Sequence, residues 1–589
     1  MLWRGNRQRP RPEHQHANRP DWHVITVGVA VTFALAILGA RLFSLAVLAH
    51  DFYSRLAENQ HGAFAEFYPD RGSIWFSDPK SPEGRYPAAV NKSLWLAYAE
   101  PRQIADAAGT AAKLAPILKA EEPELVAKLA GQDDPYEPLA HRLDDPAAAA
   151  IRELKLPGIG LTRENFRFYP DSPEGAHLVG FVGSDQEGRR LGRYGIEGYW
   201  EKQLAGESGF VSSETDPLGR WIGAAGRDLR PAKDGDEITL TVDRTIQHVA
   251  CGKLRDAVAK HGATGGSVVI LEPKTGAILA MCGMPDFDAN VFSAVTDMRV
   301  FNNPVTFTQY EPGSIFKPIV MAAAIDAGAV SPNTTYEDEG SLVIGQYTIK
   351  NSDGVGHGLQ TMTQVLEKSL NTGVIWAARR LGAERFREYA HAFGFGEKTG
   401  IDLDTEAAGD ISSLARRGDI WLATASFGQG VSATPLQMAA AYAAIANGGK
   451  LMRPYAVAAV KHADGTVEKA EPEAVRQVIA KRAATLVGGM LVRVVEAGHG
   501  KRAGVPGYFV AGKTGTAQIP RADGQGYEEH ASIGSFAGFA PVDRPAFVMV
   551  VKLDRPQDVE WAEASAAPLF GDIAKFLLQY MEIPPERRL

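Results

Sequence analysis

The chain has 589 residues, of which 45% are hydrophobic and 22% are charged, and its formal net charge is −8 at pH 7. A chain of this length and composition can bury the cores of two or more folded domains. The negative charge removes the electrostatic basis for binding nucleic acid, and the histidines lack the spacing of a metal site. We therefore expect no nucleic-acid partner and no metal or other cofactor.

The chain contains two cysteines, Cys251 and Cys282. They could form a disulfide if this part of the chain lies outside the cytoplasm, but cores of this size do not need one. Cysteine is among the residue types most often buried, so we favour two buried free thiols, with a disulfide as the alternative.

Residues 1–22 are polar and rich in arginine and proline, which is typical of a disordered tail. An apolar segment follows, interrupted by the single charge of Arg41. A central arginine costs about 2.5–3.5 kcal/mol on membrane insertion, but each Leu, Ile, Val or Phe returns about 0.3–0.6 kcal/mol. Nine such residues precede Arg41 and five follow it, so we predict a single transmembrane anchor over residues 23–49.

The rival interpretation of this segment is a cleaved signal peptide, whose apolar region is about 7–15 residues long and ends at a small-residue cleavage site. The segment here is longer, and Ser44–Ala46 is only a weak site, so we favour an uncleaved anchor. The arginines of residues 1–22 predict a cytoplasmic N-terminus. The rest of the chain is then expected on the outer (periplasmic) side of the cytoplasmic, or inner, membrane.

Residues 50–235 form a second block, in which no motif indicates catalysis. The stretch Pro101–Leu154 is rich in Ala, Glu and Lys at helical spacing and predicts two or three amphipathic helices. Glu197 could act as a base, but an acid between glycines in a turn is more often structural. We interpret the block as a pedestal, a dimerisation-type domain that sets a height above the membrane and offers a docking surface.

Residues 236–589 form a third block with predicted strands at both ends. The early part predicts a strand at Glu237–Val242, a helix at Thr245–Lys260 and a hairpin of Ser267–Leu271 with Ala277–Met281. The late part predicts strands at Tyr508–Val510, Ser535–Phe539 and Phe547–Leu553, and a last helix at Pro568–Met581. The pattern predicts one antiparallel sheet, closed by early and late strands, with a helical subdomain inserted between them.

The stretch Glu311–Pro318 carries a serine, Ser314, three residues before Lys317, and an apolar run then continues to Gly328. This predicts a turn that delivers Ser314 to the first turn of a helix, where residues i and i+3 are neighbours. The helix dipole and burial both disfavour a charged Lys317, which would make it a neutral base for Ser314. Taken alone, Ser-x-x-Lys also fits a capped helix with a surface lysine.

Two further triplets follow along the chain. Ser369–Asn371 is a Ser-x-Asn triplet, and Lys513–Gly515 is Lys-Thr-Gly. Taken singly, Ser369 fits a helix cap, Asn371 fits a turn, and Lys-Thr-Gly fits a plain strand end. All three triplets in this order are typical of the penicillin-recognising serine enzymes.

With these triplets the chain resembles the class B penicillin-binding proteins, which are membrane-anchored D,D-transpeptidases of peptidoglycan synthesis. Further stretches resemble the pedestal and transpeptidase domains of that family: Arg71–Ile74, Leu156–Ile159, Arg167–Pro170, Leu178–Gly183, Tyr194–Gly198, Phe393–Gly396, Lys398–Ile401, Gly428–Gly430 and Thr434–Gln437. The resemblance covers nearly all of residues 236–582.

The resemblance implies an α+β multidomain protein with a single N-terminal transmembrane helix and an elongated pedestal. The C-terminal penicillin-binding transpeptidase domain would have an antiparallel five-stranded sheet flanked by helices, with an inserted all-helical subdomain. The expected boundaries are a basic tail at 1–22, the anchor at 23–49, the pedestal at 50–235 and the transpeptidase domain at 236–589.

The resemblance also assigns roles to residues of the triplets. Ser314 would be the nucleophile and Lys317 its general base. Ser369 would pass a proton between a lysine and the leaving nitrogen, and Asn371 would bind the substrate backbone. Lys513, through its charge, would lower the pKa of Lys317.

The remaining roles concern the strand that carries Lys-Thr-Gly. Thr514 and Thr516 would bind the substrate carboxylate, and Gly515 would leave room for substrate along the strand edge. The oxyanion hole would be formed by the backbone N–H groups of Ser314 and Thr516.

The implied substrate is a peptidoglycan stem peptide ending in D-Ala-D-Ala, with an amine as acceptor and β-lactams as inhibitors. The implied partners are a polytopic membrane glycosyltransferase and other division proteins. We favour septal cell division over lateral elongation. The alternatives from other classes are a protein that hydrolyses or senses β-lactams and a non-catalytic scaffold for wall synthesis.

Overall fold

The structure is a computed structural model, and it describes residues 22–43, 62–67, 69–131, 136–186, 188–214, 228–521, 523 and 526–587. The chain divides into two compact units. One contains residues 1–68 and 208–232, and the other contains residues 69–207 and 233–589.

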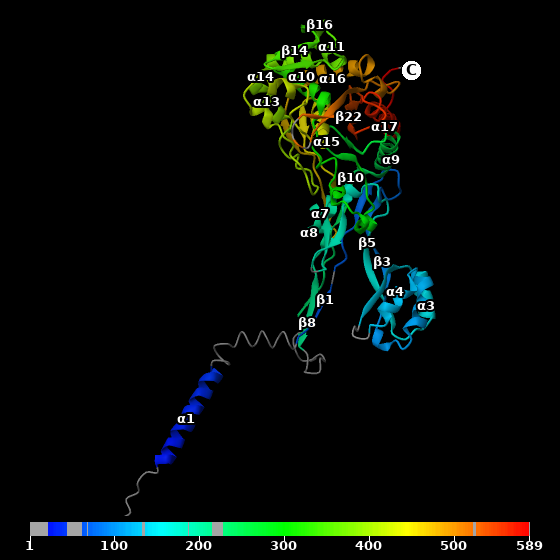
Figure 1. Cartoon of the computed structure of the whole chain (residues 1–589), viewed down its shortest axis with the longest axis vertical. Coiled ribbons are helices and arrows are strands. Elements are labelled where there is room, and N and C mark those ends of the chain that lie inside the picture. Colours follow the sequence, from blue (N-terminus) through cyan, green and yellow to red (C-terminus); the bar gives the residue numbers. More distant parts are fainter. Residues whose placement is uncertain are drawn as a thin grey trace, which may run out of the picture. The chain divides into compact units, whose positions relative to one another are not determined.

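The described residues of the first unit form the helix α1 and a small sheet (Figure 1). Helix α1 spans Trp22–Phe43, and its described hydrophobic side chains, such as Phe33 and Leu35, are exposed. Within the described part of the chain, no helix combines the length and the apolar character that crossing a membrane requires. Residues 44–49 of the predicted anchor and residues 1–21 of the predicted tail lie outside the described residues.

The small sheet of this unit pairs antiparallel strands in the order β1-β8-β9. Its strands are β1 (Gly62–Phe67), β8 (Gly209–Glu214) and β9 (Asp228–Arg230).

The second unit contains a mixed sheet, in which the described strands follow the order β19-β18-β10-β2-β3-β4, with β5 pairing with β3. Its strands are β2 (Ile74–Ser77), β3 (Arg85–Ala99), β4 (Glu137–Leu143), β5 (Ile159–Phe168), β10 (Glu237–Asp243), β18 (Val457–Lys461) and β19 (Val467–Lys469). Strand β10, predicted from its alternating pattern, runs parallel to β2 and antiparallel to β18. It therefore belongs to this sheet and joins segments that lie far apart in the sequence.

Three helices pack against β3, β4 and β5, which confirms the helical prediction for Pro101–Leu154. They are α3 (Ala107–Leu118), α4 (Glu122–Leu129) and α5 (Asp145–Glu153). Their small core contains Leu114, Leu125 and Ile151. The sequence pattern missed β4, which lies between α4 and α5. Shorter elements follow: α6 (Ala176–Val179), β6 (Phe181–Ser184), β7 (Arg190–Arg193), α7 (Gly195–Tyr199) and α8 (Glu201–Ala205).

A second sheet of this unit is antiparallel and, among the described residues, has five strands in the order β12-β11-β23-β22-β21. The strands are β11 (Gly265–Leu271), β12 (Ile278–Met284), β21 (Ala511–Pro520), β22 (Tyr527–Ala540) and β23 (Phe547–Asp554). The predicted hairpin and the closure by late strands are thus confirmed. The predicted strand at Tyr508–Val510 is wrong, because the pairing with β22 begins only at Ala511.

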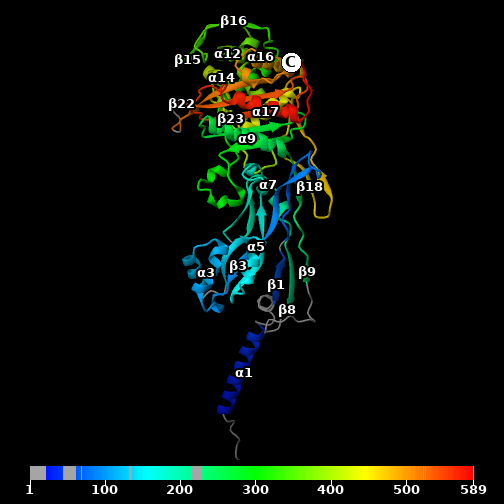
Figure 2. The ribbon, with the colours of Figure 1, turned by 90° about the vertical axis from the view of Figure 1, so that its right-hand side faces the viewer.

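Helices cover both faces of this five-stranded sheet (Figures 1 and 2). The side chains of Val268 and Val269, adjacent in β11, belong to different cores because neighbouring strand residues point to opposite faces. Helices α9 (Arg244–Lys260) and α17 (Ala566–Tyr580) cover the face of Val268, and α15 (Pro435–Ala446) covers the other face.

The segment between β12 and β21 contains most of the remaining helices: α10 (Lys317–Asp326), α11 (Met362–Glu367), α12 (Asn371–Leu381), α13 (Ala383–Ala392), α14 (Asp419–Ser426) and α16 (Lys481–Glu496). The prediction of an all-helical insertion is wrong, because the segment also forms paired strands: β13 (Thr335–Asp338) with β16 (Gly358–Thr361), β14 (Ser341–Ile344) with β15 (Tyr347–Lys350), and β17 (Lys450–Met452) with β20 (Ala474–Gln477). These strands are short and exposed in part, so their pattern is weak in the sequence.

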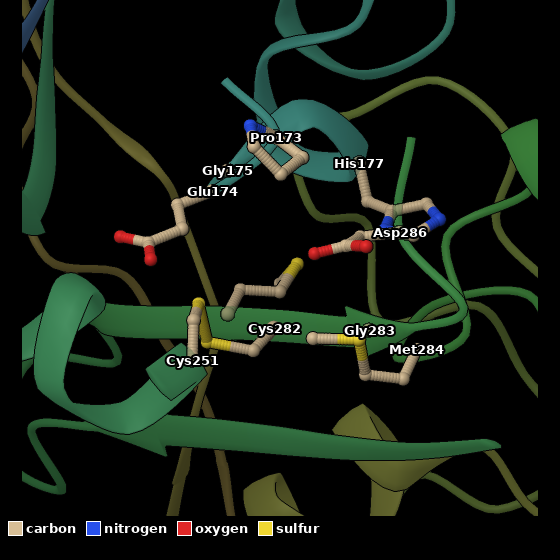
Figure 3. A pocket seen from close by; sticks show the side chains of 10 residues that line it. Pro173, Glu174, Gly175, His177, Cys251, Cys282, Gly283, Met284 and Asp286 are labelled. Atoms are coloured by element: carbon tan, nitrogen blue, oxygen red, sulfur yellow. A yellow bond between two sulfur atoms is a disulfide. The ribbon is translucent and has the colours of Figure 1, made fainter. Parts of the chain in front are cut away.

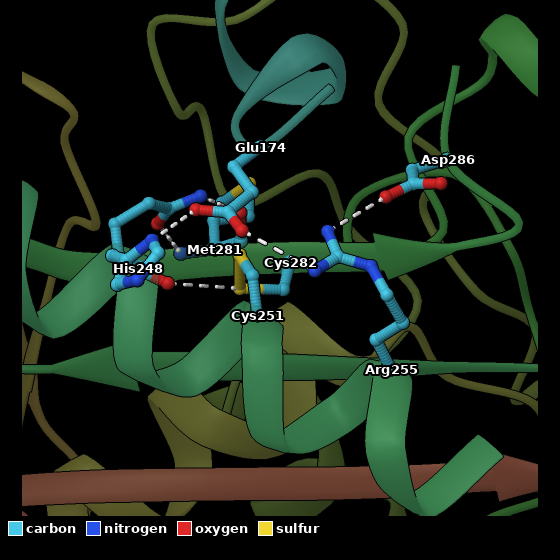
Figure 4. Close-up of a disulfide and its surroundings, with 8 residues drawn as sticks. Glu174, His248, Cys251, Arg255, Met281, Cys282 and Asp286 are labelled. Carbon is cyan, nitrogen blue, oxygen red and sulfur yellow. Dashed lines mark hydrogen bonds and ion pairs between the residues drawn. A yellow bond between two sulfur atoms is a disulfide. The ribbon is translucent and has the colours of Figure 1, made fainter. Parts of the chain in front are cut away.

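Cys251 and Cys282 form a disulfide, so the expectation of two free thiols is wrong (Figure 4). Helix α9 packs on β12, which brings the two Cα atoms to 5.3 Å, within the range that a bridge requires. This packing of residues 31 positions apart could not be derived from the two cysteines alone. Both residues are buried, as predicted.

Polar side chains lie around the disulfide. Glu174 accepts a hydrogen bond from the ring of His248 at 2.6 Å and pairs with Arg255, which also pairs with Asp286. Figure 3 shows the small cavity beside the bridge, with Pro173, Glu174 and His177 on one side of it and the cysteine pair on the other. The segment around Pro173 therefore packs over this side of the disulfide.

Candidate active site

Ser314 lies in a tight turn, η5 (Gly313–Phe316), which leads directly into α10. Gly313 has a φ of +58°, and its N–H donates to the carbonyl of Gly428 at 3.1 Å. A Cβ atom on Gly428 would lie 2.3 Å from the carbonyl oxygen of Gly313, so only glycine permits this close approach. The Gly428–Gly430 loop thus supports the turn from one side.

Helix α15 supports the same turn from below. The hydroxyl of Tyr442 donates to the carbonyl of Ile315 at 2.8 Å, and both residues are fully buried. Thr434 begins this helix with a capping box shared with Gln437. Ser314 itself remains partly exposed between buried neighbours.

The amine of Lys317 joins the first triplet to the second. Its Nζ lies 2.5 Å from the carbonyl oxygen of Ser369, 3.2 Å from Ser369 Oγ and 2.7 Å from Asn371 Oδ1. Ser369 has a φ of +57°, a left-handed conformation that is uncommon for residues other than glycine. The strained backbone directs both oxygens of Ser369 to the amine.

The chemistry of these three oxygens determines what Lys317 can do. The carbonyl of Ser369 and the amide oxygen of Asn371 only accept hydrogen bonds, whereas the hydroxyl of Ser369 can also donate. A neutral amine has two hydrogens for the two acceptors, and its lone pair then remains free for a hydroxyl proton. The arrangement is therefore suited to a proton relay between hydroxyl groups.

Burial changes the acidity of both lysines of the triplets. Lys317 and Lys513 are fully buried. Burial, and secondarily the charge of Lys513, hold the pKa of Lys317 well below its usual value. Burial lowers the pKa of Lys513 to about 7, against a smaller opposing effect of Glu563. The lowered pKa favours the neutral form of Lys317, which is the form that a general base needs.

The third triplet lies on β21, which is an edge strand of the described five-stranded sheet. Nζ of Lys513 donates to the carbonyl of Thr514 at 3.1 Å and lies 3.3 Å from its hydroxyl. Thr516 accepts a hydrogen bond on Oγ1 from the N–H of Ala562 at 3.0 Å, so its own hydrogen remains available. The unpaired edge of β21 can accept an extended peptide as an additional strand.

Gly515 is required by the protein's own packing. A Cβ atom there would lie 2.8 Å from Ser535 Oγ, 3.0 Å from Ile315 Cγ2 and 3.1 Å from the carbonyl oxygen of Pro312. The side chain of this position would therefore collide with the turn that carries Ser314. The sequence predicts that the missing side chain leaves room for substrate along the strand edge. The structure adds that it also leaves room for Ser535 of β22 and for Pro312 and Ile315 around the Ser314 turn.

The structure brings all eight predicted residues to one region. Lys317 contacts Ser369 and Asn371, and η5 packs on β21 at Gly515. Five of the eight residues are buried, and the other three are partly exposed. The buried residues are Lys317, Ser369, Lys513, Thr514 and Gly515. None of the eight lies on a separate surface.

Other side chains around this region were not predicted. The carboxylate of Glu311 accepts from the N–H of Gly430 at 2.8 Å and from the hydroxyl of Tyr527 at 3.1 Å. These bonds link the approach to η5 with both the Gly428–Gly430 loop and β22. Glu311 carries a signal in the sequence, because it opens the Glu-Pro-Gly-Ser stretch, whereas Tyr527 carries none.

Family profiles match most of the chain. The profile described as "Penicillin binding protein transpeptidase domain" matches residues 266–575, and "Penicillin-binding Protein dimerisation domain" matches residues 68–240. The two matched ranges contain the five-stranded sheet with its insertion and most of the mixed sheet, respectively.

Named relatives are similar over nearly the whole length. Stage V sporulation protein D of Bacillus subtilis is 35% identical over 574 residues, which cover 96% of this chain and 86% of that protein. Peptidoglycan D,D-transpeptidase FtsI of Escherichia coli is 31% identical over 589 residues, which cover 98% of this chain and 95% of FtsI. Among solved structures, penicillin-binding protein 3 of Mycobacterium tuberculosis, complexed with aztreonam, is similar with a TM-score of 0.68 and 27% identity, covering 89% of this chain and 98% of that one.

Proposed function

This chain belongs to the class B penicillin-binding proteins, and we propose that it cross-links peptidoglycan as a serine D,D-transpeptidase with Ser314 as its nucleophile. The observation that carries the assignment of residues is the hydrogen bonding of Lys317. Its amine meets Ser369 and Asn371 in the interior, beside the turn that presents Ser314.

In the acylation step, neutral Lys317 takes the hydroxyl proton of Ser314 as its Oγ bonds to the carbonyl carbon of the penultimate D-Ala. The backbone N–H groups of Ser314 and Thr516 stabilise the resulting oxyanion. The C–N bond then breaks, and the proton passes from Lys317 through the hydroxyl of Ser369 to the leaving nitrogen. The acyl group remains as an ester on Ser314.

In the second step, an acceptor amine attacks the carbonyl carbon of this ester. Ser369 and Lys317 remove a proton from the amine and return one to Ser314 Oγ as the C–O bond breaks. The new peptide cross-link leaves, and the hydroxyl of Ser314 is regenerated. The sequence of bonds formed and broken needs no metal and no redox cofactor.

Substrate binding uses the edge of β21 and the second triplet. The stem peptide lies along β21, and its terminal carboxylate binds the hydroxyl groups of Thr514 and Thr516, near the ammonium of Lys513. Asn371 donates a hydrogen bond to the substrate backbone. β-Lactams occupy the same place, since their strained amide mimics D-Ala-D-Ala, and they acylate Ser314.

Mass spectrometry of the intact protein with benzylpenicillin tests the assignment. We expect one adduct, on Ser314, which is absent from Ser314→Ala. The absence of any adduct on Ser314 in the wild-type protein would contradict the proposal. A fluorescent penicillin that stays bound for minutes distinguishes a transpeptidase from a β-lactam-hydrolysing protein, which would release it within seconds. If cells depleted of the wild-type protein grow normally when they produce the Ser314→Ala variant, the main role of the protein is that of a scaffold.

The site of action is the second part of the proposal. We assign septal wall synthesis, because the stretch from Arg167 to Gly183 resembles the division branch, with lateral elongation as the alternative. The expected partners are a polytopic membrane glycosyltransferase and other division proteins. A fluorescent fusion at midcell would support this assignment, and a fusion along the side wall would contradict it.

Membrane anchorage by residues 23–49, with the N-terminus in the cytoplasm and the catalytic domain outside, completes the proposal. The insertion energies of this segment and the exposed hydrophobic side chains of α1 support it. We expect the full chain to sediment with membranes and a chain without residues 1–49 to stay in the supernatant. A full chain in the supernatant would contradict anchorage.

A further inference from the structure

The N-terminus of α12 carries the Ser-x-Asn triplet, yet it has no cap of its own. The N-cap residue is Leu370, which makes no side-chain hydrogen bond to the helix. A leucine offers no oxygen to the first backbone N–H groups, so a helix start of this kind needs acceptors from elsewhere. Asn371, the first residue of the helix, and Ser369 nonetheless hold defined positions against Lys317.

The acceptors come from the strands of the inserted segment. Figure 2 shows β15 and β16 at the same end of the unit as α12. Asn351, just after β15, accepts from the N–H of Thr372 at 3.2 Å through its Oδ1. The carbonyl of Lys350 accepts from Nδ2 of Asn371 at 2.8 Å. Asn351 thus accepts from a backbone N–H at the start of α12, and Lys350, the residue before it, orients the amide of Asn371.

A buried carboxylate, Asp338 at the end of β13, organises this contact. Its side chain is 2% exposed. Its Oδ1 accepts from the hydroxyl of Thr372 at 2.6 Å, and both oxygens accept from Nδ2 of Asn351 at 3.1 and 3.0 Å. The N–H groups of Gly340 and His357 donate to it at 3.2 and 3.1 Å. Burial acts to raise the pKa of Asp338, but these hydrogen bonds outweigh it and hold the pKa below its usual value.

We propose that Asp338 is a positioning residue, which acts through Asn351 and Thr372 to hold the Ser369–Asn371 triplet against Lys317. The inference rests on the proposed function of that triplet. A negative charge next to the N-terminus of a helix is also stabilising, which strengthens the same arrangement. Without the carboxylate, the amide of Asn351 loses two hydrogen bonds and keeps the longer one to the carbonyl of Val355 at 3.3 Å. The hydroxyl of Thr372 loses its shortest hydrogen bond, at 2.6 Å.

This role predicts a defect in the rate of acylation per folded molecule. A small displacement of a reacting group can cost up to about 100-fold in rate. We therefore expect Asp338→Ala to lower the acylation rate constant at saturating fluorescent penicillin by about 10- to 100-fold. Asp338→Asn keeps the shape and an acceptor for Thr372, and its rate should lie between those of Asp338→Ala and the wild type.

The experiment measures two quantities in each protein: the fraction of molecules that is finally labelled, and the rate constant with which those molecules react. A purely structural role lowers the first, whereas positioning lowers the second. The matched control is Asp353→Ala. Asp353 lies in the loop between β15 and β16, and among the described residues its side chain bonds to Val355 and His357 but not to Asn351 or Thr372. Asp353→Ala should react at the wild-type rate.

The outcomes distinguish a failure of the proposed function from a failure of the positioning role of Asp338. If the wild-type protein is not labelled, the proposed function fails. If the wild type is labelled and Asp338→Ala reacts at the same rate, or if Asp353→Ala loses as much, the positioning role is overturned. Should Asp338→Ala fail to fold, Asn351→Ala and Thr372→Val each remove one link. Wild-type rates in both would equally overturn the proposal.

Discussion

Two fully buried titratable side chains of this protein, Glu197 and Lys317, have opposite surroundings. Glu197 is 0% exposed and pairs with Arg71 and Arg167, each at 2.6 Å. Lys317 is equally buried, but in the described part of the chain its amine meets only neutral oxygens, and the other charge that acts on it is the cation of Lys513.

The difference explains why one site is structural and the other is suited to chemistry. At Glu197, the two arginines outweigh the effect of burial, and its pKa is lowered, so the carboxylate remains charged. At Lys317, no counter-charge among the described residues offsets burial, and its pKa is lowered, so the amine loses its proton more readily. A buried charge with counter-charges joins parts of a fold, whereas a buried amine without them becomes a base.

Removal of the uncompensated amine should have the largest effect of all. Lys317→Met keeps an apolar chain of similar length and leaves no counter-charge unpaired, so we expect a folded protein. Acylation by benzylpenicillin should fall by about 10²- to 10⁴-fold, the usual contribution of a general base. The measurement is the labelling rate, together with a circular dichroism melt. A folded Lys317→Met protein that reacts at the wild-type rate would show that another group is the base.

Removal of the charge of Glu197, which its two arginines compensate, should lower the stability of the protein and leave its acylation rate unchanged. Glu197→Gln leaves Arg167 buried without its counter-charge and Arg71 with only Glu201, and we expect a loss of about 3–5 kcal/mol in the free energy of unfolding. Denaturant titration measures this loss. The control is Glu207→Gln, since the exposed pair of Glu207 with Lys233 should contribute only about 0–1 kcal/mol.

The acylation rate of the molecules that remain folded distinguishes the two sites further. In Glu197→Gln this rate should equal that of the wild type, because the arginine pairs lie outside the triplets. A slower rate with full labelling would mean that the Glu197 cluster controls the chemistry, and the contrast between the two buried charges would be lost.

Features that depend on residues close together in the sequence could be predicted, whereas features that depend on distant segments could not. Short triplets and the hairpin of β11 with β12 were predictable, because each depends on neighbouring residues. The partners of Glu197 could not be derived, since Arg71 and Arg167 lie 126 and 30 residues away from it. The disulfide was only the less favoured alternative, and the contacts of Asp338 and the packing around Gly515 were not predicted, for the same reason: each depends on contacts between distant segments.

The smallest expected effect concerns the pH dependence of acylation. Lys317 acts as a neutral amine, so the rate should rise with pH up to its lowered pKa. Lys513 binds the substrate carboxylate as a cation, so the rate should fall as its proton is lost above a pKa of about 7. Each limb changes the rate by about tenfold per pH unit, which gives a bell-shaped profile.

Lys513→Arg tests which lysine causes which limb. Arginine stays charged throughout the accessible pH range, so the falling limb should disappear. Its cation still acts on Lys317, so the rising limb should stay where it is in the wild type. The labelled fraction at each pH serves as the control for folding. If the falling limb persists in a folded Lys513→Arg protein, a group other than Lys513 sets it. If the rising limb moves instead, the arginine cation does not lower the pKa of Lys317 to the same extent as the cation of Lys513.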